Sequence, residues 1–302
     1  MKGAIMKQVK TWIMNHARPL EQALYDFFFE NGTKEDVVKA LKKFQNQDGG
    51  FGNALEPDYR NPESNPIACQ FAANIIHAMN LPKDHEMITL LLEYLKHTPY
   101  KKEGKFYFRI PSNNEYPHAP WWHYEKGNEI EGYNPTASLI GFMFYYMDES
   151  DPYYSKVEKD LDQIIRDFMN QNITEMHELK CFNELYEYVC EGLDCTNLRR
   201  KLLEQNMNAI EKDTSKWLSA YVAKPSQVLV SMHSPGIHEL MDLFHQELKM
   251  TIANRNSEGV FDIAWEWGQY QEEFEIAKKE WMGIIAVKTL RMLKDFKVNI
   301  NT

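Results

Sequence analysis

Residues 44–52 read Phe44-Gln45-Asn46-Gln47-Asp48-Gly49-Gly50-Phe51-Gly52. This stretch joins a glutamine, an Asp-Gly-Gly turn and an aromatic residue. Paired glycines can end a helix and turn the chain, because glycine accepts backbone angles that other residues avoid. The stretch therefore predicts a junction between two helices, and we expect it to define architecture more than chemistry.

Helical patterns lie on both sides of this junction. Before it, Thr33 and Asp36 form a predicted capping box, and the helix that they begin ends at Asp48. After it, Asn65-Pro66 begins a second helix, since proline suits the first turn. Apolar residues recur along one side of each helix: Val37, Leu41 and Phe44 in the first, and Ile67, Phe71, Ile75 and Met79 in the second. A long loop at residues 51–64 joins the two helices into a pair.

The same pattern recurs further along the chain. Asn134-Pro135 restates Asn65-Pro66, and residues 138–147 are apolar almost all round, as expected of a helix buried on both sides. Residues 257–261 stand where a degraded Asp-Gly-Gly-Phe would, and residues 280–287 begin another helix of the buried type. Amphipathic segments fill the remaining chain at 154–170, 173–190, 197–211 and 236–252. The sequence predicts an all-α fold of about ten to twelve helices in a single domain over residues 1–302.

The stretch at 44–52 and the proline-started helices resemble the repeat motif of the α/α toroids, the superfamily of squalene and oxidosqualene cyclases and protein prenyltransferase β-subunits. The resemblance implies that Gln45 closes an outer helix and hydrogen-bonds to neighbouring backbone. More closely, the chain looks like uncharacterised bacterial single-domain toroid proteins, through the elements Asp48 to Asp58, Ala119 to Trp122 and Glu280 to Gly283. The implied fold is an α/α toroid, a barrel of alternating outer and inner helices. That group implies no activity.

The chain lacks the catalytic motifs of the characterised enzymes that it resembles. It has no Asp-x-Asp-Asp acid motif and no Asp-Asp pair that could begin a magnesium motif. Protein prenyltransferases bind zinc through an Asp and a Cys separated by one residue, and Asp194-Cys195 has the wrong spacing. We therefore expect no cofactor and no metal.

Composition excludes several classes of protein. Lys and Arg total 34 against 44 Asp and Glu, a net charge of −10, so the chain does not supply the basic surface that nucleic acid binding needs. No window is apolar for long enough to span a membrane, and the N-terminal segment has no secretory apolar core. The sequence predicts a cytoplasmic protein whose four cysteines, none in a C-x-x-C pair, are reduced.

The loop at 51–64 carries the first candidate catalytic residues, Glu56 and Asp58. Long ordered loops are often functional, and two carboxyl groups can serve as general acid and base where burial separates their pKa values. In the alternative interpretation, Asp58 caps the loop and Arg60 neutralises one of the two acids.

Aromatic residues gather in a second loop before the helix that starts near Asn134. We predict that Trp121, Trp122, His123 and Tyr133 contact a ligand, because aromatic faces stabilise cations and stack on sugar rings. The alternative is that the two tryptophans only pack against a neighbouring helix pair.

The degraded repeat is followed by a third loop with acidic and aromatic residues. By position it corresponds to the Glu56–Asp58 loop, so Asp262 and Glu266 are further candidate acids, and Trp265 and Trp267 are candidate ligand contacts. In the alternative, the tryptophans replace the structural aromatic residue of the repeat. His233 is a further candidate binding residue, although its spacing from His238 across Pro-Gly does not fit a zinc site.

These features lead to three functional hypotheses. The first is a cyclase-like or prenyl-handling protein that protonates or binds an isoprenoid or lipid in an aromatic-lined central cavity. The second is a glycoside hydrolase or lyase with paired carboxylates and stacking tryptophans, acting on a glycan. The third is a noncatalytic scaffold, so the sequence leaves open whether the protein is an enzyme.

Overall fold

The computed structural model describes residues 2–172, 175–218 and 220–297. Within these ranges the chain forms twelve α-helices and a single two-stranded antiparallel sheet, in one compact domain. The helices are α1 (Lys2–His16), α2 (Pro19–Phe29), α3 (Lys34–Leu41), α4 (Pro66–Ala78), α5 (Glu86–His97), α6 (Thr136–Tyr146), α7 (Tyr154–Asn170), α8 (Met176–Val189), α9 (Thr196–Ala209), α10 (Pro225–Val228), α11 (Met241–Ala253) and α12 (Gln271–Asp295). The strands are β1 (Lys101–Lys102) and β2 (Lys105–Phe106). The all-α prediction is confirmed.

Local signals in the sequence placed the helices of the first pair correctly. Thr33 and Asp36 form the expected capping box at the start of α3. At the start of α4, the Asn65 side chain accepts a hydrogen bond from the amide of Ala68 over 2.8 Å, and Pro66 occupies the first turn. These caps satisfy amide groups that a helix terminus leaves unpaired, which is why they can be read from the sequence.

The Asp-Gly-Gly turn after α3 packs against α5. The side-chain amide of Gln45 donates to the carbonyl oxygens of Gly49, over 2.9 Å, and Met87, over 3.2 Å. Gly49 has a φ of +88°, and a Cβ there would lie 2.2 Å from the carbonyl oxygen of Leu90. Only glycine fits both the backbone angle and this close approach.

The degraded repeat at 257–261 forms the same turn as residues 46–51. In the first turn Asn46 exchanges backbone hydrogen bonds with Gly49 and Gly50, over 3.1 and 2.8 Å. In the second, Asn256 does the same with Gly259 and Val260, over 2.9 Å in each case. The aromatic residues that follow, Phe51 and Phe261, are both buried. The repeat inferred from a weak sequence match is therefore present in the backbone.

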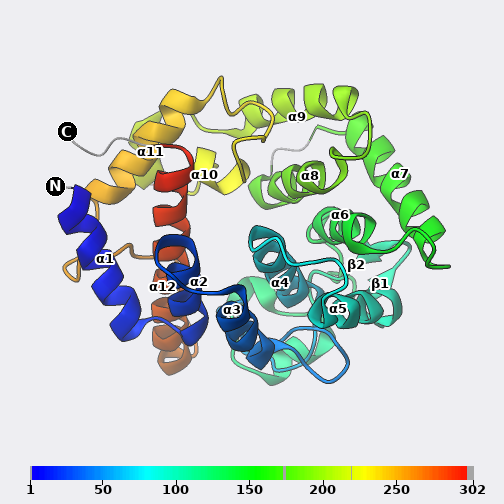
Figure 1. Cartoon of the computed structure of the whole chain (residues 1–302), viewed down its shortest axis with the longest axis horizontal. Helices are drawn as coiled ribbons and strands as arrows, with labels where there is room; N and C mark the ends of the chain where they lie inside the picture. The colour runs from blue at the N-terminus through cyan, green and yellow to red at the C-terminus, as the bar shows by residue number, and fades with distance from the viewer. Residues whose placement is uncertain (1, 173–174, 219, 298–302) are drawn as a thin grey trace.

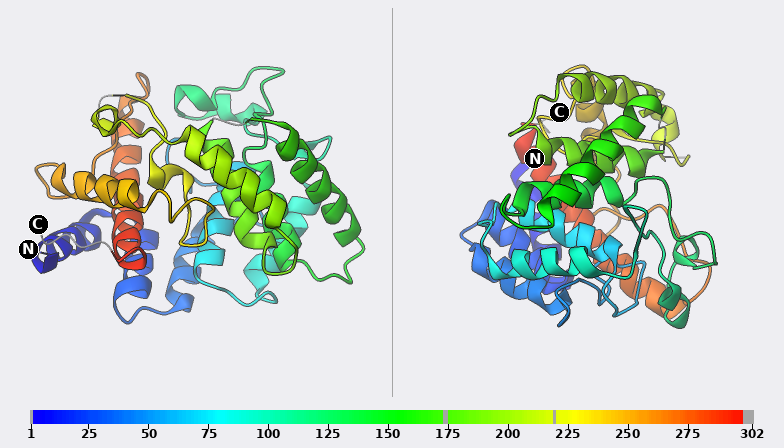
Figure 2. Two further views of the ribbon diagram at one scale, coloured as in Figure 1. Left: turned by 90° about the horizontal axis from the view of Figure 1, so that it is seen from above. Right: turned by 90° about the vertical axis from the view of Figure 1, so that its right-hand side faces the viewer.

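The helices pack in an order that brings the two ends of the chain together. α6 contacts α4, α7 and α8, and α8 in turn contacts α9 and α10. α12 packs against α1 and α2, so the first and last helices lie together on one side of the molecule, opposite α5 to α7 (Figures 1 and 2). Most residues of α6 are buried, as predicted for residues 138–147.

One prediction about the cysteines is wrong. Cys190 and Cys195 form a disulfide across the turn between α8 and α9, with their Cα atoms 5.7 Å apart. The two residues are five positions apart, so they form no C-x-x-C pair, and only the turn between the helices brings them together. Cys69 and Cys181 are free and buried. Among the described residues no helix is long and apolar enough to cross a membrane.

Candidate functional site

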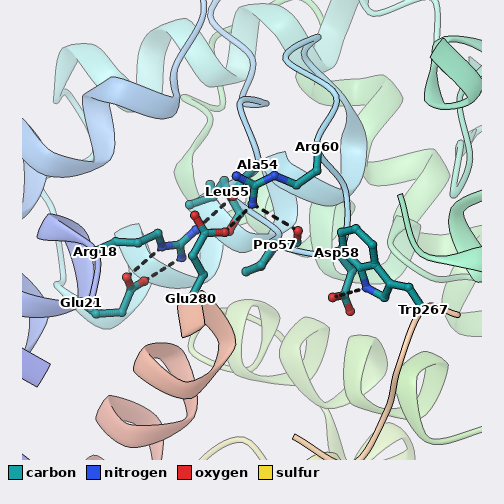
Figure 3. A network of polar contacts seen from close by, with 9 residues as sticks. All are labelled: Arg18, Glu21, Ala54, Leu55, Pro57, Asp58, Arg60, Trp267 and Glu280. Atoms are coloured by element: carbon teal, nitrogen blue, oxygen red, sulfur yellow. Dashed lines mark hydrogen bonds and ion pairs between the residues drawn. The ribbon is translucent and has the colours of Figure 1, made fainter. Parts of the chain in front are cut away.

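A buried carboxylate, Asp58, lies at the meeting point of distant loops. Its Oδ1 accepts a hydrogen bond from the indole nitrogen of Trp267 over 2.9 Å, and its Oδ2 accepts one from Trp265 over 3.0 Å. Figure 3 shows the Trp267 indole reaching Asp58 from the loop before α12. Only 2% of Asp58 is exposed.

Burial changes the proton affinity of Asp58. Loss of hydration raises the pKa of its carboxyl group to about 6. The indoles of Trp267, Trp281 and Trp265 and the charge of Arg60 hold the pKa down, but do not outweigh burial. Near neutral pH the group therefore exchanges readily between its acid and its base form, as a general acid must.

Aromatic residues of α4 and α12 pack beside the tryptophans at this carboxylate. The indole of Trp265 meets that of Trp281, on α12, edge to face with ring centres 5.4 Å apart. The ring of Phe71, on α4, meets Trp281 at 6.0 Å. We call the five residues Asp58, Phe71, Trp265, Trp267 and Trp281 the Asp58 site. Phe71 and Trp265 are only half-buried, so solvent reaches this aromatic cluster.

Glu56 differs from Asp58 in its surroundings. It is buried, and its Oε2 has no hydrogen-bond partner among the described residues. Loss of hydration, and then the nearby charge of Asp58, raise the pKa of Glu56 well above its ordinary value. Burial thus makes both carboxyl groups hold a proton more tightly than a free acid does, and the charge of Asp58 adds to this effect at Glu56.

Two arginines fix the loop to neighbouring helices. Arg18 forms a bidentate ion pair with Glu21, over 2.9 and 2.7 Å, and donates to the carbonyl oxygens of Ala54 and Leu55. Arg60 pairs with Glu280 on α12 over 2.5 Å (Figure 3). The direct partner of Arg60 is therefore Glu280, and not Glu56 or Asp58 as one interpretation of the sequence held.

The loop with paired tryptophans packs against the Asp58 loop. The amide of Ala119 donates to the carbonyl oxygen of Asp58 over 2.9 Å, and the amide of Arg60 donates to that of Pro117 over 3.0 Å. Gln269, from the loop before α12, donates to the carbonyl oxygen of His118 over 3.0 Å. The loops at 51–64, 111–133 and 254–270 thus meet around Asp58.

Most predicted contacts in the tryptophan loop have other neighbours. Trp122 is buried and stacks on Tyr59 with ring centres 5.4 Å apart, so it packs the core beneath the loops. Trp121 is 36% exposed, and its carbonyl oxygen accepts from Arg109. His123 is exposed, with its Nδ1 3.3 Å from Nε2 of His118.

The remaining candidates lie outside the Asp58 site. Asp262 is exposed and pairs with Lys278 over 3.4 Å, and Glu266 is also exposed. Tyr133 is buried, and its hydroxyl is hydrogen-bonded to Asp167 on α7. The side chain of His233 is 84% exposed.

Chain geometry explains why the acidic side chains of the third loop point away from its tryptophans. In extended backbone, successive side chains point to opposite sides. Trp265 and Trp267 face the interior. Ala264, which precedes Trp265, and Glu266, which lies between the two tryptophans, face solvent. The sequence placed the loop correctly but not the direction of each side chain.

Sequence reasoning missed Phe71 and Trp281 as members of the site. Phe71 was assigned only to the apolar side of its helix, and Trp281 only to a motif shared with toroid proteins. For Phe71, the available signal was its place near the start of the helix that follows the Asp58 loop. Trp281 lies well inside α12, and no local pattern connects it to that loop. Among the described residues no group of three or more His, Cys, Asp or Glu side chains is placed to hold a metal ion.

No family model, no curated protein and no solved structure matches the chain.

Proposed function

We propose that the helices form an α/α toroid in which the even-numbered helices make the inner ring. The contacts run from α4 to α6, from α6 to α8 and from α8 to α10, and α12 contacts α2. The loops before α4, α6, α10 and α12 each lead from an odd-numbered to an even-numbered helix, so in this fold they gather at one end of the ring. The Asp58 site lies at that end.

At this site we propose acid-initiated chemistry on an isoprenoid or another unsaturated lipid. The observation that carries the proposal is Asp58, a carboxyl group with a pKa of about 6 between indole rings. An acid of this kind can protonate an uncharged substrate, and the negative faces of Trp265, Trp281 and Phe71 can stabilise the cation that results.

The chemistry balances without a further reactant. The carboxyl proton of Asp58 adds to one alkene carbon, and the neighbouring carbon becomes cationic. Loss of another proton from the substrate to the Asp58 carboxylate restores the acid and leaves a shifted double bond or a new ring. Because Trp265 covers Oδ2 and is half-buried, the substrate would approach past this indole.

The first experiment is native mass spectrometry of freshly purified protein, followed by solvent extraction of any bound molecule. We expect an isoprenoid or lipid from the wild type and from Asp58→Asn, which keeps the shape of the side chain. Incubation with the recovered lipid should give a rearranged product with the wild type only. Asp262→Asn is the matched control, since it removes an exposed carboxylate of the same type, and it should remain active.

Recovery of no lipid, together with binding of an oligosaccharide, would instead support the glycan hypothesis. One observation favours that second candidate: Trp121, beside the same loops, is 36% exposed, and an exposed indole is a surface on which a sugar ring can stack. In that case Trp121→Ala should weaken glycan binding, whereas lipid binding at the Asp58 site should not depend on Trp121.

A further inference from the structure

A polar pocket lies between α1, α12 and the turn at 256–260. Its volume is about 590 Å³, which suits a small molecule. α1 and α12 pack side by side (Figure 1), and the pocket is lined from both helices and from the turn. Its lining includes five exposed polar side chains and one buried ring: Lys7, Gln8, Asn15, Glu258 and Lys279, with Trp12.

This pocket is separate from the Asp58 site, although α12 contributes to both. Lys279 lines the pocket, whereas Trp281, two residues later on the same helix, packs beside Trp265 at the Asp58 site. Two residues correspond to a rotation of about 200° around a helix axis. The two side chains therefore leave nearly opposite faces of α12.

The repeat turn at 257–261 places an acid in the pocket. The indole nitrogen of Trp12 donates to Oε2 of Glu258 over 2.5 Å. A Cβ at Gly259 would lie 2.0 Å from Nε2 of Gln8, so the turn rests directly on α1. Among the described residues none donates to the other oxygen of Glu258, Oε1, and the side chain is exposed. Trp12 thus fixes Glu258 and leaves Oε1 as an acceptor in the pocket.

The first repeat turn uses its acid differently. Oδ1 of Asp48 accepts from the amide of Gly50 over 3.0 Å and from the hydroxyl of Ser64 over 2.7 Å, so that carboxylate holds its own turn and loop. Glu258 reaches across to another helix instead. The second turn keeps the backbone of the repeat and presents its carboxylate to the pocket.

Two ammonium groups in the pocket have no partner among the residues that the structure describes. The exposed side chains of Lys7 and Lys279 form neither an ion pair nor a hydrogen bond there. By contrast, Lys278, beside Lys279 on α12, pairs with Asp262 over 3.4 Å. The pocket therefore combines two lysines with one carboxylate, in a chain whose net charge is −10. This local excess of positive charge favours an anionic ligand.

We propose that this pocket binds a phosphate monoester that carries hydroxyl groups. Lys7 and Lys279 bind the phosphate, which has a charge of about −1.5 to −2 near pH 7. Lysine contacts phosphate as a point charge, so long exposed side chains suit this role. Oε1 of Glu258 accepts hydrogen bonds from the hydroxyl groups. A sugar phosphate and a mononucleotide both have this chemistry.

The carboxylate also fixes the orientation of the ligand. Glu258 repels a phosphate and attracts hydroxyl donors, so the charged end of the ligand lies toward the lysines and the hydroxyl end toward the turn. The side-chain amides of Gln8 and Asn15 line the same pocket, and each supplies donors and an acceptor for the body of the ligand.

Isothermal titration calorimetry of the whole protein at pH 7.5 tests the proposal with AMP and glucose 6-phosphate. Their unphosphorylated parents, adenosine and glucose, are the controls. We expect at least one monoester to bind about tenfold or more tightly than its parent, because the lysines contact only the phosphate. Binding of AMP identifies a mononucleotide as the ligand, and binding of glucose 6-phosphate a sugar phosphate. If neither monoester binds at up to about 5 mM, or if each binds no better than its parent, the proposal is wrong.

Lysine variants locate the binding in this pocket. Lys7→Gln and Lys279→Gln should each weaken binding of the monoester by about fivefold or more, because each removes a charged contact. Lys249→Gln is the matched control, since Lys249 is an exposed lysine on α11 outside the pocket, and it should bind as the wild type does. Unchanged affinity in both pocket variants, with native circular dichroism spectra, would refute the site.

Glu258→Gln tests the role of the carboxylate. It should weaken binding of the monoester, because hydrogen bonds to a charged acceptor are the stronger ones. Binding of inorganic phosphate, which needs only the lysines, should stay the same or become tighter once the negative charge is gone. A parallel loss for both ligands would contradict the assignment of Glu258 to the hydroxyl groups. Asp58→Asn should bind the monoester as the wild type does, so the outcome is independent of the chemistry proposed at Asp58.

Discussion

The indole nitrogen of Trp267 donates to Oδ1 of Asp58 over 2.9 Å, and this hydrogen bond joins residues 209 positions apart. It connects the loop before α4 with the loop before α12. Trp265 donates to the other oxygen, Oδ2. Each oxygen of this buried carboxylate therefore accepts a hydrogen bond from an indole. The Asp58 site is therefore held together by the same contacts that set its proton affinity.

Asp58 should make the stability of the protein depend on pH. Its pKa in the folded state, about 6, exceeds the ordinary value of 3.8, so the folded state binds the proton more tightly than the unfolded state. The resulting stabilisation is complete below pH 4 and is lost as the pH rises through 6. The two-unit difference corresponds to about 3 kcal/mol. Urea unfolding of the wild type and of Asp58→Asn between pH 4 and 8 measures it.

The difference in unfolding free energy between the wild type and Asp58→Asn should change by about 3 kcal/mol between pH 4 and pH 8. A difference that stays constant with pH would show that Asp58 titrates normally. Asp262→Asn serves as the control for removal of a carboxylate at an exposed position.

Trp267→Phe should destabilise the protein by about 2 kcal/mol beyond the loss of packing, because it removes a hydrogen bond to an ionised group. It should also raise the pKa of Asp58 further, since the indole of Trp267 is the strongest of the groups that lower it. Trp217→Phe is the matched control, because buried Trp217 donates to a neutral acceptor, the carbonyl oxygen of Glu211. Urea unfolding at pH 7.5 compares the two variants, and equal losses would contradict the charged hydrogen bond.

The sequence was sufficient for features that depend on neighbouring residues. The cap at Thr33, the start of α4 at Pro66 and the turn at Gly49 follow from local backbone chemistry and were predicted correctly. Partners across the fold could not be predicted in this way. The pairing of Arg60 with Glu280 depends on the packing of α12, and no pattern within either segment identifies it.

The Arg60–Glu280 ion pair should contribute more than a surface pair. Its side chains are 21% and 17% exposed, and it fastens the Asp58 loop to α12. A double-mutant cycle with Arg60→Met and Glu280→Gln should give a coupling energy of about 1–2 kcal/mol. Lys10 and Glu30 form a control pair with the same 2.5 Å separation but about 40% exposure, so their coupling should be clearly smaller. Equal coupling in both cycles would show that Arg60 does not anchor the loop.

Gly49→Ala should be among the most destabilising single substitutions in the chain. The φ of +88° alone costs about 1–2 kcal/mol for a residue with a side chain, and the added Cβ would lie 2.2 Å from the carbonyl oxygen of Leu90. Backbone on both sides prevents relief of this overlap, so we expect a total loss of about 4 kcal/mol or more. Gly127→Ala separates the two effects, because Gly127 has a φ of +101° but no atom within 4 Å of the added carbon. Thermal unfolding of both variants should show a small loss for Gly127→Ala and a large one for Gly49→Ala, and similar losses would mean that the turn does not press against α5.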